Sequence, residues 1–112
     1  MARFDVTTTE EPGQIRVTVA GECDLAVSGR LSEVLTDAVG RSPVVVVDLA
    51  GLAFLDSSGM HGLVIAHRAA RERGGRLVAV GATGNVATVL ELTGVGALLR
   101  PQPADHADQG PG

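Results

Sequence analysis

The sequence is poor in residues that mark several common protein classes. It has no lysine, tryptophan or tyrosine, only two phenylalanines and a single cysteine, Cys23. A lone cysteine cannot form an internal disulfide, so an apolar core must hold the fold together. Because aromatic residues are so scarce, that core must consist of valine, leucine, isoleucine and alanine. We expect Cys23 to be one of its small buried members.

Clustered positive charge and long hydrophobic runs are also missing. Thirteen acidic residues against nine arginines give a net charge of −4. This argues against a nucleic-acid partner, because phosphate contacts need clustered positive charge. No apolar run reaches the roughly 18 residues of a membrane span, and the first residues lack the basic-then-apolar pattern of a signal peptide. We therefore expect a cytoplasmic protein that binds neither nucleic acid nor membrane.

What is present is enough apolar sequence for one domain: 45% of 112 residues. Alternating or β-branched stretches predict strands over 4–9 and 15–20, joined by the turn EEPG. The valine run at 44–49 predicts a third strand, and its lack of alternation suggests that both faces are covered. A short strand is expected over 77–80, with 97–99 as an optional last strand.

Helical periodicity follows each of the later strands. Apolar residues at helical spacing predict helices beginning at Ser28 and ending before Gly40, over 57–73 and over 85–93. The inner stripe of the second helix is expected to contain Met60, Leu63, Val64, His67 and Ala70. The resulting order, β-β-α-β-α-β-α, predicts an α/β domain over 1–100 with helices packed on a sheet. The polar tail at 101–112 is expected to be disordered.

The stretch Asp56-Ser57-Ser58-Gly59 lies between the third strand and the second helix. Its side chains could cap the free N–H groups of the first helical turn. Two adjacent hydroxyls exceed what one cap requires, and ligands of α/β proteins usually meet the carboxyl ends of strands. The stretch is therefore also a candidate functional site.

A catalytic role for this stretch has weak support. A nucleophilic serine needs a base and a third orienting group. His61 follows Ser57 by one helical turn, but the G-x-S-x-G pattern and a glycine-rich oxyanion loop are missing. Asp24 in GECD could pair with Asp56 across a cleft, although a cap or turn is the simpler role. We expect no enzyme activity.

Neither a metal nor a cofactor is expected. His61 and His67 are six residues apart, which is not the i, i+4 spacing of a helical metal pair, and His67 lies on the apolar stripe. The loop GATGNVA at 81–87 looks like a phosphate-binding turn of nucleotide-dependent reductases. However, the chain reaches its polar tail where a dinucleotide fold needs a further strand and an acid. We expect a glycine-rich strand-to-helix turn.

Four segments in order carry a family resemblance: AGECDL at 20–25, VVVDLAGLAFLDSSGM at 45–60, RGGRLVAV at 73–80 and LELTG at 90–94. Together they resemble the STAS domain of bacterial anti-sigma factor antagonists, over residues 4–100. The resemblance implies a small α/β domain with a mixed sheet and no catalysis of its own. In that family, the domain binds an anti-sigma factor that is also an ATP-dependent serine kinase, and binding releases a sigma factor.

The resemblance also assigns roles to individual residues. The family's kinase phosphorylates the serine after the aspartate of D-S-[ST]-G, and a serine phosphatase reverses the reaction. Ser57 is therefore the expected phosphoacceptor. The expected partner-binding residues are Asp24, Asp56, Ser58, Gly59, Met60 and His61. His61 departs from the usual pattern and could modulate the phosphate or the docking surface. STAS domains also act as scaffolds without a kinase switch, in stress-signalling complexes or lipid transporters, and this alternative stays open.

Overall fold

The computed structural model describes residues 3–101, and each predicted strand or helix before residue 95 is present. The elements are β1 (Phe4–Glu11), β2 (Gln14–Cys23), α1 (Leu25–Arg41), β3 (Val44–Leu55), α2 (Ser57–Glu72), β4 (Arg76–Val80), α3 (Gly84–Thr93) and α4 (Val95–Leu99). The expected disorder of 101–112 lies, beyond Pro101, outside the described residues. The predicted α/β class and element order are confirmed.

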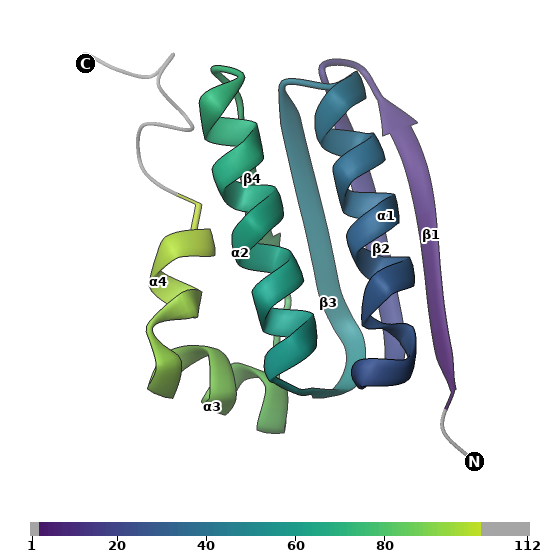
Figure 1. Ribbon diagram of the computed structural model, residues 1–112, viewed down its shortest axis with the longest axis vertical. Helices are drawn as coiled ribbons and strands as arrows, with labels where there is room; N and C mark the ends of the chain where they lie inside the picture. Colours follow the sequence, from purple (N-terminus) through teal and green to yellow (C-terminus); the bar gives the residue numbers. More distant parts are fainter. Residues whose placement is uncertain (1–2, 102–112) are drawn as a thin grey trace.

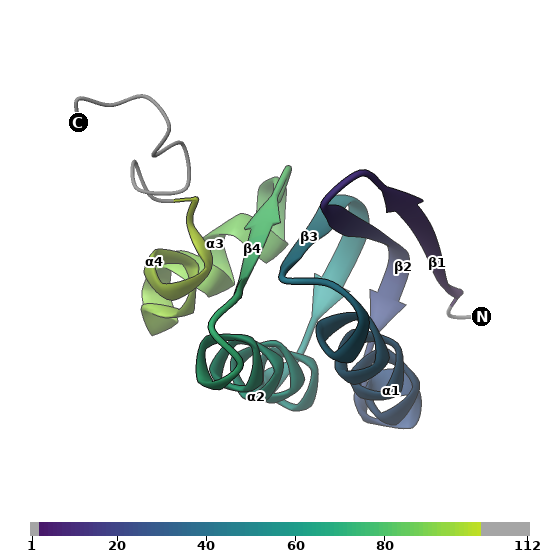
Figure 2. The same ribbon diagram turned by 90° about the horizontal axis from the view of Figure 1, so that it is seen from above.

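The four strands form one mixed sheet in the order β1-β2-β3-β4. β1 and β2 form an antiparallel hairpin, whereas β2 pairs with β3, and β3 with β4, in parallel. Helices α1 and α2 lie side by side on one face of the sheet, and α3 and α4 lie beyond its β4 edge (Figures 1 and 2).

The core lies between the sheet and the α1–α2 layer. Alternate residues of β2 and β3 point into it, and the central ones are completely buried: Val17, Val19, Val45, Val47 and Leu49. The prediction that both faces of β3 are covered is wrong. Successive right-handed crossovers run in one direction across the sheet, so α1 and α2 pack on the same face.

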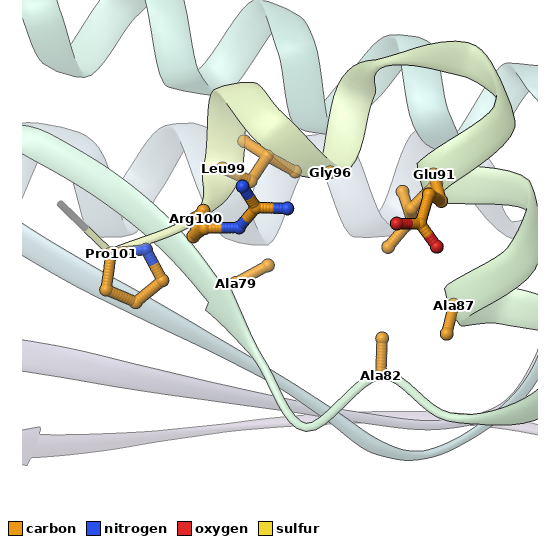
Figure 3. Close-up of a pocket in the computed structure, with 9 residues that line it drawn as sticks. Ala79, Ala82, Ala87, Glu91, Gly96, Leu99, Arg100 and Pro101 are labelled. Carbon is orange, nitrogen blue, oxygen red and sulfur yellow. The ribbon is translucent and has the colours of Figure 1, made fainter.

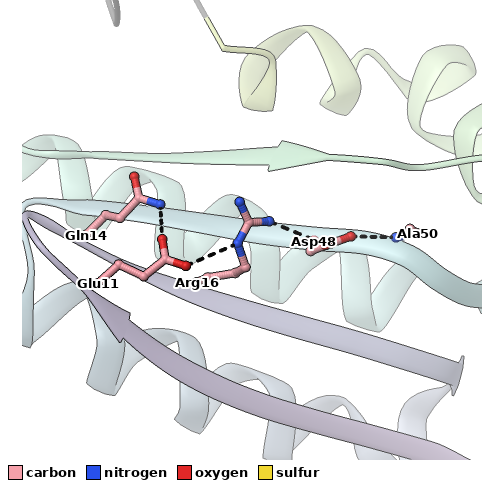
Figure 4. Close-up of polar contacts among 5 residues, drawn as sticks. All are labelled: Glu11, Gln14, Arg16, Asp48 and Ala50. Atoms are coloured by element: carbon pink, nitrogen blue, oxygen red, sulfur yellow. Dashed lines mark hydrogen bonds and ion pairs between the residues drawn. The ribbon is translucent and has the colours of Figure 1, made fainter.

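The open face of the sheet carries the polar residue that interrupts the valine run. Asp48 lies there, half-buried like its neighbours Val44 and Val46. The Arg16 guanidinium is 3.4 Å from the Asp48 carboxylate and 3.7 Å from that of Glu11, so ion pairs join β1, β2 and β3 (Figure 4). Asp48 is therefore compatible with a central strand because only one side of that strand faces the core.

Several boundaries and one element differ from prediction: β1 and β2 extend beyond 4–9 and 15–20, and α1 continues to Arg41. β3 continues to Leu55 because it pairs with β2 beyond the valine run, through two register shifts. Helix α1 begins at Leu25, three residues earlier than expected. The optional strand at 97–99 is wrong: Gly94, with φ of +81°, reverses the chain, and the one-turn helix α4 then buries Leu99 in the core.

Small residues bring α2 close to its neighbours. A Cβ atom at Gly59 would lie 2.6 Å from Leu55 Cδ1 and 2.9 Å from Cys23 Sγ, and one at Gly62 would lie 2.7 Å from Ser32 Oγ. The buried face of α2 is therefore rotated from the predicted stripe. It contains Gly59, Gly62, Leu63, Ala66, His67 and Ala70, whereas Met60 and Val64 are only half-buried.

We predict that Gly59→Ala destabilises the protein. Alanine favours a helix over glycine by up to about 1 kcal/mol, but overpacking against the buried Leu55 and Cys23 costs about 1–3 kcal/mol. Gly29 provides a matched control, because it is helical and a Cβ atom there would have nothing within 4 Å. Urea unfolding should give a lower free energy of unfolding for Gly59→Ala and a higher one for Gly29→Ala. An equal increase in the free energy of unfolding for both variants would contradict the close packing around Gly59.

Candidate functional site

The ends of β2 and β3 place two aspartates side by side. Cys23 and Leu55 are register partners in parallel strands, which lie about 4.8 Å apart. Asp24 and Asp56 follow directly and precede α1 and α2, and the Asp56 N–H donates to the Cys23 carbonyl at 3.1 Å. The structure thus joins GECD and DSSG at one edge, where α1 and α2 begin (Figure 1).

Both aspartates cap helices. The Asp24 carboxylate accepts a hydrogen bond from the Ala26 N–H at 3.0 Å. Asp56 Oδ1 accepts from the Ser58 N–H at 3.0 Å and from the Gly59 N–H at 3.2 Å. These bonds satisfy donors that the first helical turn leaves free. The predicted capping roles are confirmed.

The local contacts determine how the acidic and thiol groups titrate. The Ser58 hydroxyl, followed by the N–H groups of Gly59, Ser58 and Leu25, holds the pKa of Asp56 below its ordinary value, against partial desolvation. Burial raises the pKa of Cys23 to about 11, and the charges of Asp56 and Asp24 add to this effect. At neutral pH, Asp56 is therefore ionised and Cys23 is a thiol. As predicted, Cys23 is a buried core residue.

The two serines of the motif have different environments. Ser58 is half-buried, and its hydroxyl donates to Asp56 Oδ1 at 2.6 Å. Ser57 is exposed at the first position of α2, and its hydroxyl makes no hydrogen bond with any residue in 3–101. Ser58 supports the turn, whereas the Ser57 hydroxyl is open to another molecule.

Apolar side chains surround this edge. Leu25 is 75% exposed and Phe54 is 38% exposed, although both adjoin buried strand ends. Met60 is half-buried, with the Thr93 hydroxyl 3.6 Å from its sulfur, so the end of α3 adjoins the first turn of α2. We define the seam surface as Asp24, Leu25, Phe54, Asp56, Ser57, Met60 and His61.

Sequence reasoning missed Leu25 and Phe54. The sequence could have indicated that Phe54 is exposed. Leu55 points into the core, and adjacent strand residues point to opposite faces. Among the residues predicted to bind a partner, His61 is exposed, Asp24, Asp56, Ser58 and Met60 are half-buried, and Gly59 is buried.

The catalytic and metal alternatives gain no support. His61 and Ser57 are not hydrogen-bonded to each other. Within the described part of the chain, no group of three His, Cys, Asp or Glu residues could hold a metal ion. His67 is buried, as predicted, and its Nδ1 lies 3.5 Å from the Leu77 carbonyl, to which it can only donate. No helix within residues 3–101 combines the length and apolarity needed to cross a membrane.

The glycine-rich segment forms a turn at 81–83 between β4 and α3, which begins at Gly84. Dinucleotides bind open α/β sheets where the strand order reverses, and the order of the described strands never does. The adjoining cavity of about 270 Å³ is lined by small side chains such as Ala79, Ala82 and Ala87, with Glu91 and Arg100 contributing opposite charges (Figure 3). The segment is therefore the predicted strand-to-helix turn.

We predict that Ser58→Ala is more destabilising than Ser57→Ala. The first change removes a hydrogen bond to an ionised carboxylate, which contributes about 1.5–3 kcal/mol. The second removes an exposed group and should stay within about 0.5 kcal/mol of the parent. Loss of the Ser58 hydroxyl should also raise the pKa of Asp56 toward its ordinary value, which carboxyl ¹³C NMR titration would detect. An unchanged Asp56 titration in Ser58→Ala would contradict the assigned hydrogen bond.

Comparisons with known proteins agree with this architecture. A family model described as "Mlab, STAS domain" matches residues 6–101, and a search of curated proteins found no match. Among solved structures, the unphosphorylated anti-sigma factor antagonist SpoIIAA of Bacillus is 17% identical with a TM-score of 0.73, covering 96% of this chain and 95% of that one. An antagonist from Mycobacterium paratuberculosis is 24% identical with a TM-score of 0.75, covering 92% and 90%.

A transporter contains the same fold as a small part of its chain. The match to the murine anion transporter Slc26a9 is 20% identical with a TM-score of 0.66, covering 78% of this chain and 15% of the transporter. At these identities, the structural matches establish the fold. Together with the family model, which spans nearly all described residues, they show that the chain belongs to the STAS-domain family.

Proposed function

We propose that this protein is an anti-sigma factor antagonist controlled by phosphorylation of Ser57. Its unphosphorylated form binds an anti-sigma factor that is also a serine kinase and so releases a sigma factor. The observation that carries the proposal is the contrast between the two serines: the Ser57 hydroxyl is exposed and unengaged, whereas Ser58 is bonded to Asp56. The fold shared with SpoIIAA supports it.

The position of Ser57 allows the domain to tolerate a phosphate. A phosphoserine carries about −1.5 to −2 charges at neutral pH. At the first position of α2, that charge meets the positive end of the helix dipole, beside the Ser58 and Gly59 N–H groups that donate to Asp56. Phosphorylation should therefore leave the fold intact and act on the partner.

The seam surface explains why a partner would respond strongly. Leu25 and Phe54 offer apolar contact area, while Asp24 and Asp56 already place two carboxylates beside Ser57. A partner docked there must desolvate the phosphate dianion or repel it. A loss of a few kcal/mol weakens binding at least a hundredfold, because 1.4 kcal/mol corresponds to tenfold.

The other predicted residues have distinct roles in this proposal. Asp56, Ser58 and Gly59 shape the turn, and Met60 extends the apolar area. His61 is exposed one helical turn after Ser57, within reach of a phosphate or a partner side chain. A serine phosphatase would restore the binding form. The protein would act in the cytoplasm, with no catalysis of its own.

We predict that Ser57→Ala retains the kinase partner and that Ser57→Glu loses it by at least tenfold. Glutamate at the start of a helix is compatible with the helix dipole, so the loss should reflect the interface. Thr36→Glu, an exposed change in α1 away from the seam surface, adds the same charge as a control. Affinity can be measured by surface plasmon resonance with the cognate kinase.

Phosphopeptide mapping tests the same assignment by chemistry. Incubation with the kinase and ATP should modify Ser57, and the Ser57→Ala variant should remain unmodified. A phosphate on another residue, or equal binding by Ser57→Glu and the parent, would refute the proposed switch.

We also predict that Leu25→Ser weakens kinase binding about tenfold or more without unfolding the domain. Leu25 is three-quarters exposed, so the free protein loses little packing. Leu98→Ser is the control, because Leu98 is 47% exposed but lies in α4, away from the seam surface. If Leu25→Ser binds the kinase as tightly as the parent and the control do, Leu25 has no role in docking.

A second candidate is a scaffold subunit without a kinase switch, in a stress-signalling complex or a lipid transporter. The matching family model is described as "Mlab, STAS domain", and the Slc26a9 anion transporter contains the same fold as 15% of its chain. Both matches favour this candidate. Co-purification with a transporter ATPase, undiminished by Ser57→Glu, would select the scaffold over the switch.

A further inference from the structure

Strand β1 has an outer edge that no other strand or helix of the described chain covers. It comes first in the strand order, so only its inner side pairs, with β2, and it lies outermost in both views of the fold (Figures 1 and 2). The Arg3 carbonyl accepts a hydrogen bond from the Glu22 N–H. Because the bonds of an antiparallel ladder alternate along a strand, the odd-numbered residues of β1 bond to β2. The backbone groups that point outward belong to the even-numbered residues Phe4, Val6, Thr8 and Glu10.

This edge lacks several features that prevent a strand from pairing with another chain. Proteins protect an edge with proline, a bulge or charged side chains, especially lysine. β1 contains neither proline nor lysine, and its register with β2 runs without a shift from Phe4 to Glu11. Within residues 3–101, the outward N–H and carbonyl groups of β1 make no hydrogen bond. The edge can therefore accept one more strand.

We propose that β1 pairs in antiparallel orientation with β1 of a second copy of this chain, so that two four-stranded sheets join into one. In such a ladder, outward-pointing residues face outward-pointing residues. A symmetric pair of strands must therefore be centred on a residue, and the candidates near the middle of β1 are Val6, Thr7 and Thr8. The register centred on Thr7 pairs all of residues 3–11 in each copy.

The charges of the two copies favour the register centred on Thr7. On the open face of the sheet, it places Arg3 opposite Glu11 of the second copy, and their side chains are 83% and 35% exposed. Facing residues in this position have Cα atoms about 4.5 Å apart, close enough for an ion pair. On the helix face, Glu10 lies opposite Phe4 of the second copy, whose ring centre is 6.0 Å from the Arg30 guanidinium carbon. Both contacts bring opposite charges together.

The two neighbouring registers lose these contacts. A register centred on Val6 removes the ionic partner of Arg3, and one centred on Thr8 places Asp5 opposite Glu11 of the second copy. Opposite charges across two strands stabilise their pairing, whereas like charges that face each other destabilise it. Charge complementarity therefore selects a second copy of this chain, in one register, as the occupant of the edge.

The dimer is expected to be weak. Residues 3–11 form a smaller interface than the roughly 20–30 residues a side of a standard stable complex, so we expect a dissociation constant between about 10 μM and 1 mM. Because the β1 edge shares no residue with the seam surface, the inference does not depend on the proposed function.

Cysteine crosslinking of the full chain tests the register. Thr7→Cys should form a disulfide-linked dimer under mild oxidation, because Cα atoms that face each other across the twofold axis lie about 4.5 Å apart, within the range of disulfides. Thr9→Cys is the matched control, exposed on the same face of the same strand. In the proposed register, Thr9 lies about 14 Å from Thr9 of the second copy, so this variant should not crosslink. Cys23 is buried and does not compete.

Sedimentation equilibrium measures the dimer without a crosslink. Thr8→Pro removes one outward N–H group and should weaken dimerisation at least tenfold, since proline is tolerated where the N–H of an edge strand faces solvent. Arg3→Glu should weaken it severalfold by placing like charges opposite each other. Arg68→Glu makes the same charge change at an exposed position of α2 and should dimerise as the parent does.

Three outcomes would overturn the proposal: a parent protein that stays monomeric up to about 1 mM, equal crosslinking by Thr7→Cys and Thr9→Cys, and unchanged dimerisation by a folded Thr8→Pro variant. Thermal unfolding checks the fold of each variant. If Thr8→Pro does not fold, the comparison of Arg3→Glu with Arg68→Glu takes its place, and equal dimerisation by these two variants would contradict the proposed register.

Discussion

The seam surface depends on the hydrogen bonds that the Asp56 carboxylate accepts. One oxygen accepts hydrogen bonds from the Ser58 hydroxyl and from two N–H groups of the first turn of α2. The backbone N–H of the same residue ties the turn to the end of β2. Because Ser58 is drawn inward by this capping bond, Ser57 is left on the outside. A common helix cap thus separates two chemically identical side chains.

Close packing beneath the cap determines where that outward hydroxyl lies. Gly59 leaves no room for a Cβ atom above Leu55 and Cys23, and Gly62 leaves none beside Ser32. Helix α2 therefore sits close to the strand ends and to α1, so that the first turns of both helices share one edge. A larger residue at Gly59 would have to displace Leu55, Cys23 or α2 itself, whereas the Ser32 hydroxyl can rotate away from a Cβ atom at Gly62.

The two ends of α2 carry opposite charges, and both agree with the helix dipole. Asp56 caps the positive end, while Arg71 lies in the last turn near the negative end. The acidic end displays the proposed phosphoacceptor, and the arginine-bearing end lies about 20 Å away along the helix.

The sequence by itself determined what depends on near neighbours. Periodicity predicted the order of strands and helices before residue 95, and the D-S-S-G pattern predicted the cap, because these features involve residues within a few positions of one another. Only the tertiary structure placed Asp24 beside Asp56, since strand register decides that contact. It also decided that one face of β3 stays open and that residues 95–99 form a helix. Crossover direction and long-range packing control these features, and no local pattern encodes them.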